Sequence, residues 1–98
     1  MAEILTRNTN TYSLNLSENQ ITNQGVKFLI RGLAYNKTLK VLNLTANKLT
    51  VKSLDLFMEL FKWNSTLDHV ILTQNKMNKI TEKSKIMACQ QMGVKVDV

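Results

Sequence analysis

The feature that most constrains this chain of 98 residues is a pattern of leucines and asparagines that recurs every 28 residues. The central copy reads L-x-x-L-x-L-x-x-N-x-L over residues 39–49. The matching positions of the two flanking copies are Thr11, Leu14, Leu16, Asn19 and Ile21, then Leu67, Val70, Leu72, Asn75 and Met77. The apolar columns agree with the single exception of Thr11, so three equivalent structural units are predicted.

Each copy continues with the spacing of an amphipathic helix. Apolar residues recur at positions 26, 29, 30 and 33, and again at 54, 57, 58 and 61. Thr22 and Thr50 stand where a helix N-cap belongs. Asn36 and Asn64 stand where each helix should end, and asparagine tolerates the left-handed backbone conformation common there. Each unit is therefore predicted to be a strand, a turn, a helix and a return.

This pattern resembles the leucine-rich repeat of the ribonuclease-inhibitor type, whose units have this length and carry the same motif before a helix. The resemblance implies an α/β fold, namely a short solenoid that forms a right-handed β-α superhelix. Its parallel sheet would line the concave face and its helices the convex face. In that family the motif asparagines, here Asn19, Asn47 and Asn75, bond to the backbone of the bend after each strand, which predicts a structural ladder.

The repeat divides one predicted domain into five segments. They are a half-repeat cap over 1–10, repeats over 11–38, 39–66 and 67–93, and a closing strand over 94–98. In the last repeat, helical spacing is expected to continue through Ile80, Ile86, Cys89 and Met92. Gly93 then breaks the helix. Val96 lies 26 residues after Val70, so the closing strand comes slightly early.

Charge and cysteine content limit the expected partners. The net charge is +6, but only two of the 13 basic residues are arginine, and the lysines are spread over all repeats with a mild cluster at residues 76–85. This favours an ordinary solvated surface, so nucleic acid is not the expected partner. No apolar run approaches the ~20 residues of a membrane helix. The single cysteine, Cys89, permits no internal disulfide, which favours a reducing cytoplasmic compartment and leaves delivery into a host cell open.

Strand alternation defines a candidate binding surface. Residues beside the inward-facing leucines should point to the concave side. The predicted partner-binding residues are Tyr12, Ser13, Asn15, Lys40, Val41, Asn43, Asp68, His69 and Ile71. Two further candidates are Trp63, on the convex side, and Val96, at the sheet edge.

The sequence favours a module that binds a polypeptide partner on its concave strand face. The alternatives are a repeat unit that self-assembles into a homo-oligomer through its incomplete ends, or a fragment of a longer repeat protein such as a GTPase regulator or effector. Catalysis, a metal and a cofactor are not expected. The only histidine, His69, has no nucleophile motif beside it, and Cys89 is the only other soft ligand.

Overall fold

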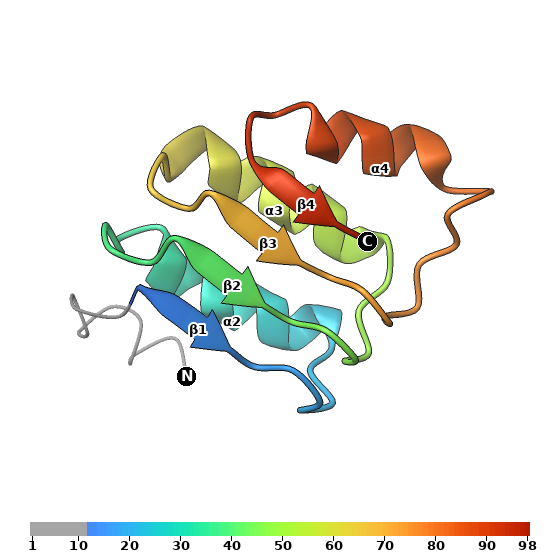
Figure 1. The fold of residues 1–98 in the computed structure, drawn as a ribbon, viewed down its shortest axis with the longest axis horizontal. Coiled ribbons are helices and arrows are strands. Elements are labelled where there is room, and N and C mark those ends of the chain that lie inside the picture. The colour runs from blue at the N-terminus through green and yellow to red at the C-terminus, as the bar shows by residue number, and fades with distance from the viewer. Residues whose placement is uncertain (1–11) are drawn as a thin grey trace.

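The computed structural model describes residues 12–98 as a parallel four-stranded sheet with helices behind it (Figure 1). Strands and helices alternate along the chain as β1 (Ser13–Asn15), α2 (Asn23–Leu33), β2 (Val41–Asn43), α3 (Lys52–Trp63), β3 (His69–Ile71), α4 (Lys83–Gln90) and β4 (Lys95–Asp97). The strand order in the sheet follows the chain order. This is the predicted α/β solenoid. The predicted half-repeat over 1–10, together with Thr11, lies outside the described residues.

The register of the sheet follows the repeat length. Leu14 pairs with Leu42, which pairs with Val70, so equivalent residues of successive copies lie side by side. Val70 pairs in turn with Val96, which confirms that the closing strand comes two residues early. Each strand side chain therefore stands beside its counterpart in the next copy, on the same face of the sheet.

The core lies between the sheet and the helices. The strands contribute the buried residues Leu42, Val70 and Val96, and α2 and α3 contribute Val26, Leu29, Leu33, Leu54, Phe57 and Leu60. Burying each such side chain stabilises the fold by about 1.5–3 kcal/mol relative to leaving it in water. The largest of them, Phe57, stacks on Phe61 with the ring centres 6.2 Å apart. No single copy could enclose this core, so the copies depend on one another.

The motif asparagines lie inside the bends that follow the strands. The Nδ2 atom of Asn47 donates to the carbonyl oxygens of Leu16 (3.0 Å) and Leu44 (2.9 Å). Its Oδ1 accepts from the backbone N–H groups of Asn19 and Ile21 in the preceding copy, at 3.0 and 2.9 Å. These are the hydrogen bonds that a structural ladder requires, because backbone groups buried in a bend need partners.

Asn75 makes the equivalent hydrogen bonds one copy later. Its Oδ1 accepts from the N–H groups of Asn47 (3.1 Å) and Leu49 (3.0 Å), and its Nδ2 donates to the carbonyl of Leu44 at 2.9 Å. Within residues 12–98, the exposed Asn19 of the first copy donates a hydrogen bond to the carbonyl of Ser17. Asn47 and Asn75 therefore each complete a bend in the copy that precedes them.

A second pair of asparagines, at the helix ends, works differently from the prediction. Asn64 has an extended backbone with φ −113°, not a left-handed one. Its Nδ2 donates to the carbonyls of Leu33 and Asn36 in the preceding copy, while its Oδ1 accepts from the N–H groups of Thr66 and Leu67. The side chain, rather than an unusual backbone, completes the return to the next strand, so the expected left-handed cap is wrong.

The last repeat departs from the predicted helix. Ile80 belongs to a turn before α4 and is 88% exposed, so the expectation that it continues the helical spacing is wrong. The turn is held by Asn78, whose Oδ1 accepts from the N–H groups of Ile80 and Thr81. Glu82 accepts from the N–H of Asn78 in return, at 2.7 Å. This local network delays the helix to Lys83 and leaves Ile80 in solvent.

Candidate functional site

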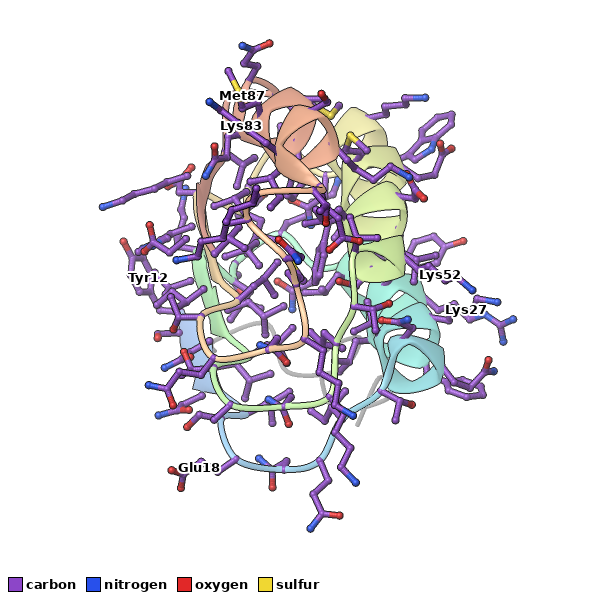
Figure 2. The ribbon with its side chains drawn as sticks, turned by 90° about the vertical axis from the view of Figure 1, so that its right-hand side faces the viewer. Tyr12, Glu18, Lys27, Lys52, Lys83 and Met87 are labelled. Atoms are coloured by element: carbon purple, nitrogen blue, oxygen red, sulfur yellow. The ribbon has the colours of Figure 1, made fainter. Side chains whose placement is uncertain are left out.

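The helices cover one face of the sheet and leave the other open. We call this the open strand face, and it corresponds to the predicted concave side. Its strand residues form two columns, Ser13, Val41, His69 and Lys95 beside Asn15, Asn43, Ile71 and Asp97. Tyr12 extends it at one edge and is 65% exposed. Figure 2 shows Tyr12 on the sheet side of the molecule, opposite Lys27 and Lys52 on the helices.

Two of the predicted binding residues are engaged in local structure. Asn15 accepts hydrogen bonds at its Oδ1 from the backbone N–H and the hydroxyl of Ser17, at 2.9 and 2.6 Å. Asn43 accepts from the N–H of Thr45 at 3.0 Å. An asparagine that bonds to the backbone two residues ahead forms an Asx-turn, which directs the chain out of the strand. The side chains of Asn15 and Asn43 therefore stabilise the bends that follow their strands.

Ile71 occupies the same position in the third copy. Its side chain cannot accept a hydrogen bond, so it contributes nothing of this kind to the bend. It is half-buried on the open strand face and does not belong to the core. Here the repeat has a bulky apolar residue where its own architecture uses asparagine.

Val41 lies diagonally from Ile71 on the neighbouring strand. In register, Val41 pairs with His69 and Ile71 pairs with Asn43, so the two apolar side chains share one face at a diagonal position. Side chains in this relation are neighbours on one face of the sheet, on strands about 4.8 Å apart. Both are half-buried. They form a small apolar centre on an otherwise polar surface.

Charged and polar pairs surround this centre. The ammonium group of Lys40 lies 3.9 Å from the carboxylate of Asp68 on the β2–β3 side. His69 Nε2 lies 2.6 Å from Asp97 Oδ2, between β3 and β4. An apolar centre with a polar, solvent-accessible rim is the common plan of protein-binding surfaces.

The strand ends on this face are also polar. The hydroxyl groups of Thr45 and Thr73, which follow β2 and β3, are 3.1 Å apart and hydrogen-bonded. Both lie beside the apolar centre in the next row. They extend the hydrogen-bonding rim beyond the strands themselves.

The nine predicted binding residues all lie on or beside the open strand face, but the prediction missed two. Lys95 and Asp97 of the closing strand add a fourth pair of side chains to the two columns. The signal was present in the alternation of residues 94–98, which places 95 and 97 opposite the buried 94 and 96. The predicted closing strand included both residues, but the predicted binding surface did not.

The two additional candidates lie elsewhere. Trp63 is 75% exposed at the end of α3, and its Nε1 donates to Glu59 at 3.4 Å. This hydrogen bond, together with Lys62, lowers the pKa of Glu59. Val96 is buried and faces the core, so only its backbone reaches the sheet edge, where its carbonyl accepts from Gln90 Nε2 at 3.0 Å. A contact by Val96 at the edge would therefore use its backbone and not its side chain.

The positions and surroundings of metal-ligating and nucleophilic side chains within residues 12–98 bear on chemistry beyond binding. There, no group of three or more histidine, cysteine, aspartate or glutamate side chains is placed to hold a metal ion. Cys89 is buried against the core, and this burial, with a smaller contribution from Asp55, raises the pKa of its thiol from 9.0 to about 11. A thiol in that state is a poor nucleophile. Among the described helices, none is both long and apolar enough to span a bilayer.

Comparison with known proteins agrees with this architecture. The family model described as "Leucine Rich repeat" matches residues 12–29 and 35–58. With the repeated strand–helix unit and the parallel sheet, the match shows that the chain has a fold of the leucine-rich-repeat type. Solenoids of this kind present extended surfaces on which other proteins bind, so the general class is a protein-binding module. No curated protein has a significantly matching sequence.

Two solved structures have a similar fold. One is described as "Leiomodin-1 Actin-Binding Site 2 (ABS2)", with a TM-score of 0.80 and 20% identity over 98% of this chain and 58% of that one. The other is the C-terminal domain of tropomodulin from Caenorhabditis elegans, with a TM-score of 0.73 and 11% identity over 97% of this chain and 57% of that one. The chain thus spans well under two thirds of either structure. At these identities the likeness is one of fold.

Proposed function

We propose that this protein is a non-catalytic interaction module that binds a polypeptide on its open strand face, centred on Val41 and Ile71. The observation that carries the proposal is the replacement at position 71. Asn15 and Asn43 each accept a backbone hydrogen bond in the bend, and Ile71 stands in their column without that role. An apolar side chain that the fold does not use, on a face that the helices leave open, is suited to contact with a partner.

The surroundings of the apolar centre favour a polypeptide over a strongly charged ligand. Within the open strand face, Lys40 is near Asp68, and Lys95 shares the face with Asp97, so the two signs of charge are balanced. A nucleic-acid surface would instead carry clustered unpaired basic groups. Balanced charges around a small apolar patch fit a partner that offers one or two apolar side chains and polar groups around them.

The test is a pull-down from native lysate with three matched baits, read by mass spectrometry. The substitution Ile71→Asn restores the residue that the chain itself uses in its other copies, and Val41→Ser removes the second apolar group. We expect both to lose the partners captured by the wild type. Phe28→Ser is the control, because Phe28 is a 50% exposed apolar residue on α2, on the opposite side.

Capture that persists in both strand-face variants and disappears with Phe28→Ser would transfer the binding surface to the helices. Circular dichroism of each variant shows whether it is folded, so that loss of capture is not loss of structure. Captured partners would then be tested one at a time with the purified protein.

Actin is the second candidate for a direct test, since one similar structure carries the description of an actin-binding site. Co-sedimentation of the purified protein with filamentous actin, with Ile71→Asn as a matched variant, decides this. If the protein stays in the supernatant at high actin concentration, actin in this form is not its partner. The result leaves the strand-face proposal standing, because it concerns one partner only.

Self-assembly through the sheet edge at β4 is an alternative against which one hydrogen bond counts. The outward-facing carbonyl of Val96 on β4 already accepts a hydrogen bond from Gln90, so the edge is partly covered. Covered edges resist pairing with a second chain. Light scattering over a range of concentrations tests it, and a dimer that grows when Gln90→Ala uncovers the edge would support self-assembly.

A further inference from the structure

A groove lies at the end of the molecule formed by α4 and the closing strand, away from the open strand face. It has a volume of about 500 Å³. Its apolar lining comes from Ile80, Ile86, Met87 and Val98. Ile80 is 88% exposed and Met87 44% exposed, so the groove presents apolar surface directly to solvent. Exposed apolar residues that gather around one concavity mark a binding site.

The charged residues of this groove are Lys79 and Lys83. Among the described residues neither ammonium group has a hydrogen-bond or ion-pair partner. A third lysine of this region is placed differently. Lys85, two residues further along α4, points to α3 and lies 3.0 Å from Asp55. The positive charge of the groove is therefore not neutralised by the part of the chain that the structure describes.

The spacing on α4 places charge and apolar surface together. Lys83 and Met87 are four residues apart and so lie on the same side of the helix. Figure 2 shows them next to each other at one end of the molecule, far from Lys27 and Lys52. Ile80 reaches the groove because the Asn78 turn holds it outside the helix. The turn that ended the predicted helical spacing is thus the element that builds the groove.

We propose that this groove docks an acidic polypeptide segment that carries a bulky apolar side chain between its carboxylates. The apolar side chain would fill the space between Ile80 and Met87, and the carboxylates would pair with Lys79 and Lys83. The segment binds by its side chains and does not extend the sheet, because Gln90 occupies the outward carbonyl of Val96.

Charge selects this occupant over a second copy of the protein. Two copies meeting groove to groove would bring their lysines Lys79 and Lys83 together with no acidic side chain among the lining residues, and like charges that approach in an interface are unfavourable. A nucleic acid would match the lysines but leave the apolar floor without a counterpart. An acidic segment with an apolar anchor satisfies both features.

The test measures fluorescence anisotropy of a short labelled peptide with a central phenylalanine flanked by glutamates. We expect saturable binding that weakens as salt rises, because the lysines are exposed and screened. Two control peptides have the phenylalanine flanked by lysines, or a serine flanked by glutamates, and neither should bind measurably. If the lysine peptide binds as well as the glutamate peptide, the proposal is overturned.

Variants locate the binding. The double substitution Lys79→Glu with Lys83→Glu should lower the affinity for the glutamate peptide by about tenfold or more. Lys27→Glu with Lys52→Glu makes the same change of charge on α2 and α3, and should leave the affinity within about twofold. An equal loss in both pairs would show general attraction to a basic protein and overturn the proposal. Ile80→Ser tests the apolar anchor, and its high exposure keeps this change out of the core.

Two further measurements separate this site from its alternatives. Ile71→Asn, which alters the open strand face, should bind the glutamate peptide as the wild type does. Light scattering of the wild type and Ile80→Ser tests the second copy as occupant. A concentration-dependent dimer that Ile80→Ser abolishes would assign the groove to self-association and overturn the acidic segment.

Discussion

His69 Nε2 lies 2.6 Å from Asp97 Oδ2, so a side chain of β3 is hydrogen-bonded to a side chain of the closing strand β4. The two residues are 28 apart in sequence, yet they are not paired in the sheet. His69 pairs with Lys95, because the last copy is two residues short, and this moves Asp97 to the diagonal position. The shortened copy thus places a carboxylate where an imidazole can reach it.

The first prediction concerns this contact. Asp97→Ala should lower the free energy of unfolding by up to about 1 kcal/mol, because the side chains are only partly shielded from water. Urea denaturation followed by circular dichroism measures it. Asp68→Ala is the control, since Asp68 is more exposed and lies 3.9 Å from Lys40, and it should change stability less. Equal effects would show that the His69 contact adds nothing specific.

The second prediction concerns the asparagine ladder. Asn47→Ala should lower the free energy of unfolding by about 3 kcal/mol. The substitution removes the amide that bonds to the N–H groups of Asn19 and Ile21 and to the carbonyls of Leu16 and Leu44. Asn19→Ala removes the same residue type from the same column. It should cost well under half as much, since Asn19 is exposed. Chemical denaturation of both variants checks the ratio, and similar costs would contradict the ladder as described.

The third prediction concerns backbone conformation in the second bend. Ala46 has φ 58°, in the left-handed region, which non-glycine residues adopt at a cost. Ala46→Gly should therefore raise the free energy of unfolding by about 0.5–1 kcal/mol. Ala34→Gly is the control, because Ala34 has φ −58° at the end of α2 and gains nothing from glycine. The melting temperature should rise for Ala46→Gly and fall for Ala34→Gly.

The fourth prediction concerns pH. Burial, with a contribution from Asp55, raises the pKa of the Cys89 thiol from 9.0 to about 11. Between these values the unfolded chain loses this proton while the folded protein keeps it. Stability must therefore fall as pH rises through this window, by on the order of 2 kcal/mol. Cys89→Ala should lack this part of the slope in urea titrations at pH 8 to 11, whatever its absolute stability, and an unchanged slope would contradict the assignment.

The fifth prediction exchanges residues between copies. Ile71→Asn gives the third bend the hydrogen-bond acceptor that Asn43 gives the second, so stability should be unchanged or higher by up to about 1 kcal/mol. The reciprocal Asn43→Ile should lower it by a similar amount. Calorimetric melts of both variants test this. A large loss with Ile71→Asn would mean that Ile71 serves the fold after all.

The part of the fold that follows from equal spacing was predictable from the sequence. Because equivalent residues recur at 28, the pairing of Ser13 with Val41 and of Val41 with His69 follows from the repeat length. The early closing strand followed in the same way from Val70 and Val96. The two columns of the open strand face needed only this register and the alternation of side chains.

The features that could not be predicted depend on side-chain contacts that are not repeated from one copy to the next. Asp97 reaches His69 only because of the diagonal shift, and strand alternation does not reveal that distance. The late start of α4 depends on the Asn78 network with Glu82, which competes locally with the helical spacing of Ile80. The groove depends on that turn in three dimensions. A residue-spacing argument treats each copy as the same, so it fails where the last copy differs.

The ladder also gives the molecule a direction. The bend at Asn19 and Ile21 is completed by Asn47, and the bend at Asn47 and Leu49 is completed by Asn75. Each copy therefore receives its amide acceptor from the copy that follows. A substitution in one copy should therefore destabilise the bend of the preceding copy. Loss of the Asn75 side chain should speed hydrogen exchange at the Leu49 amide, in the copy before it. A substitution in an early copy should leave the later bends unchanged.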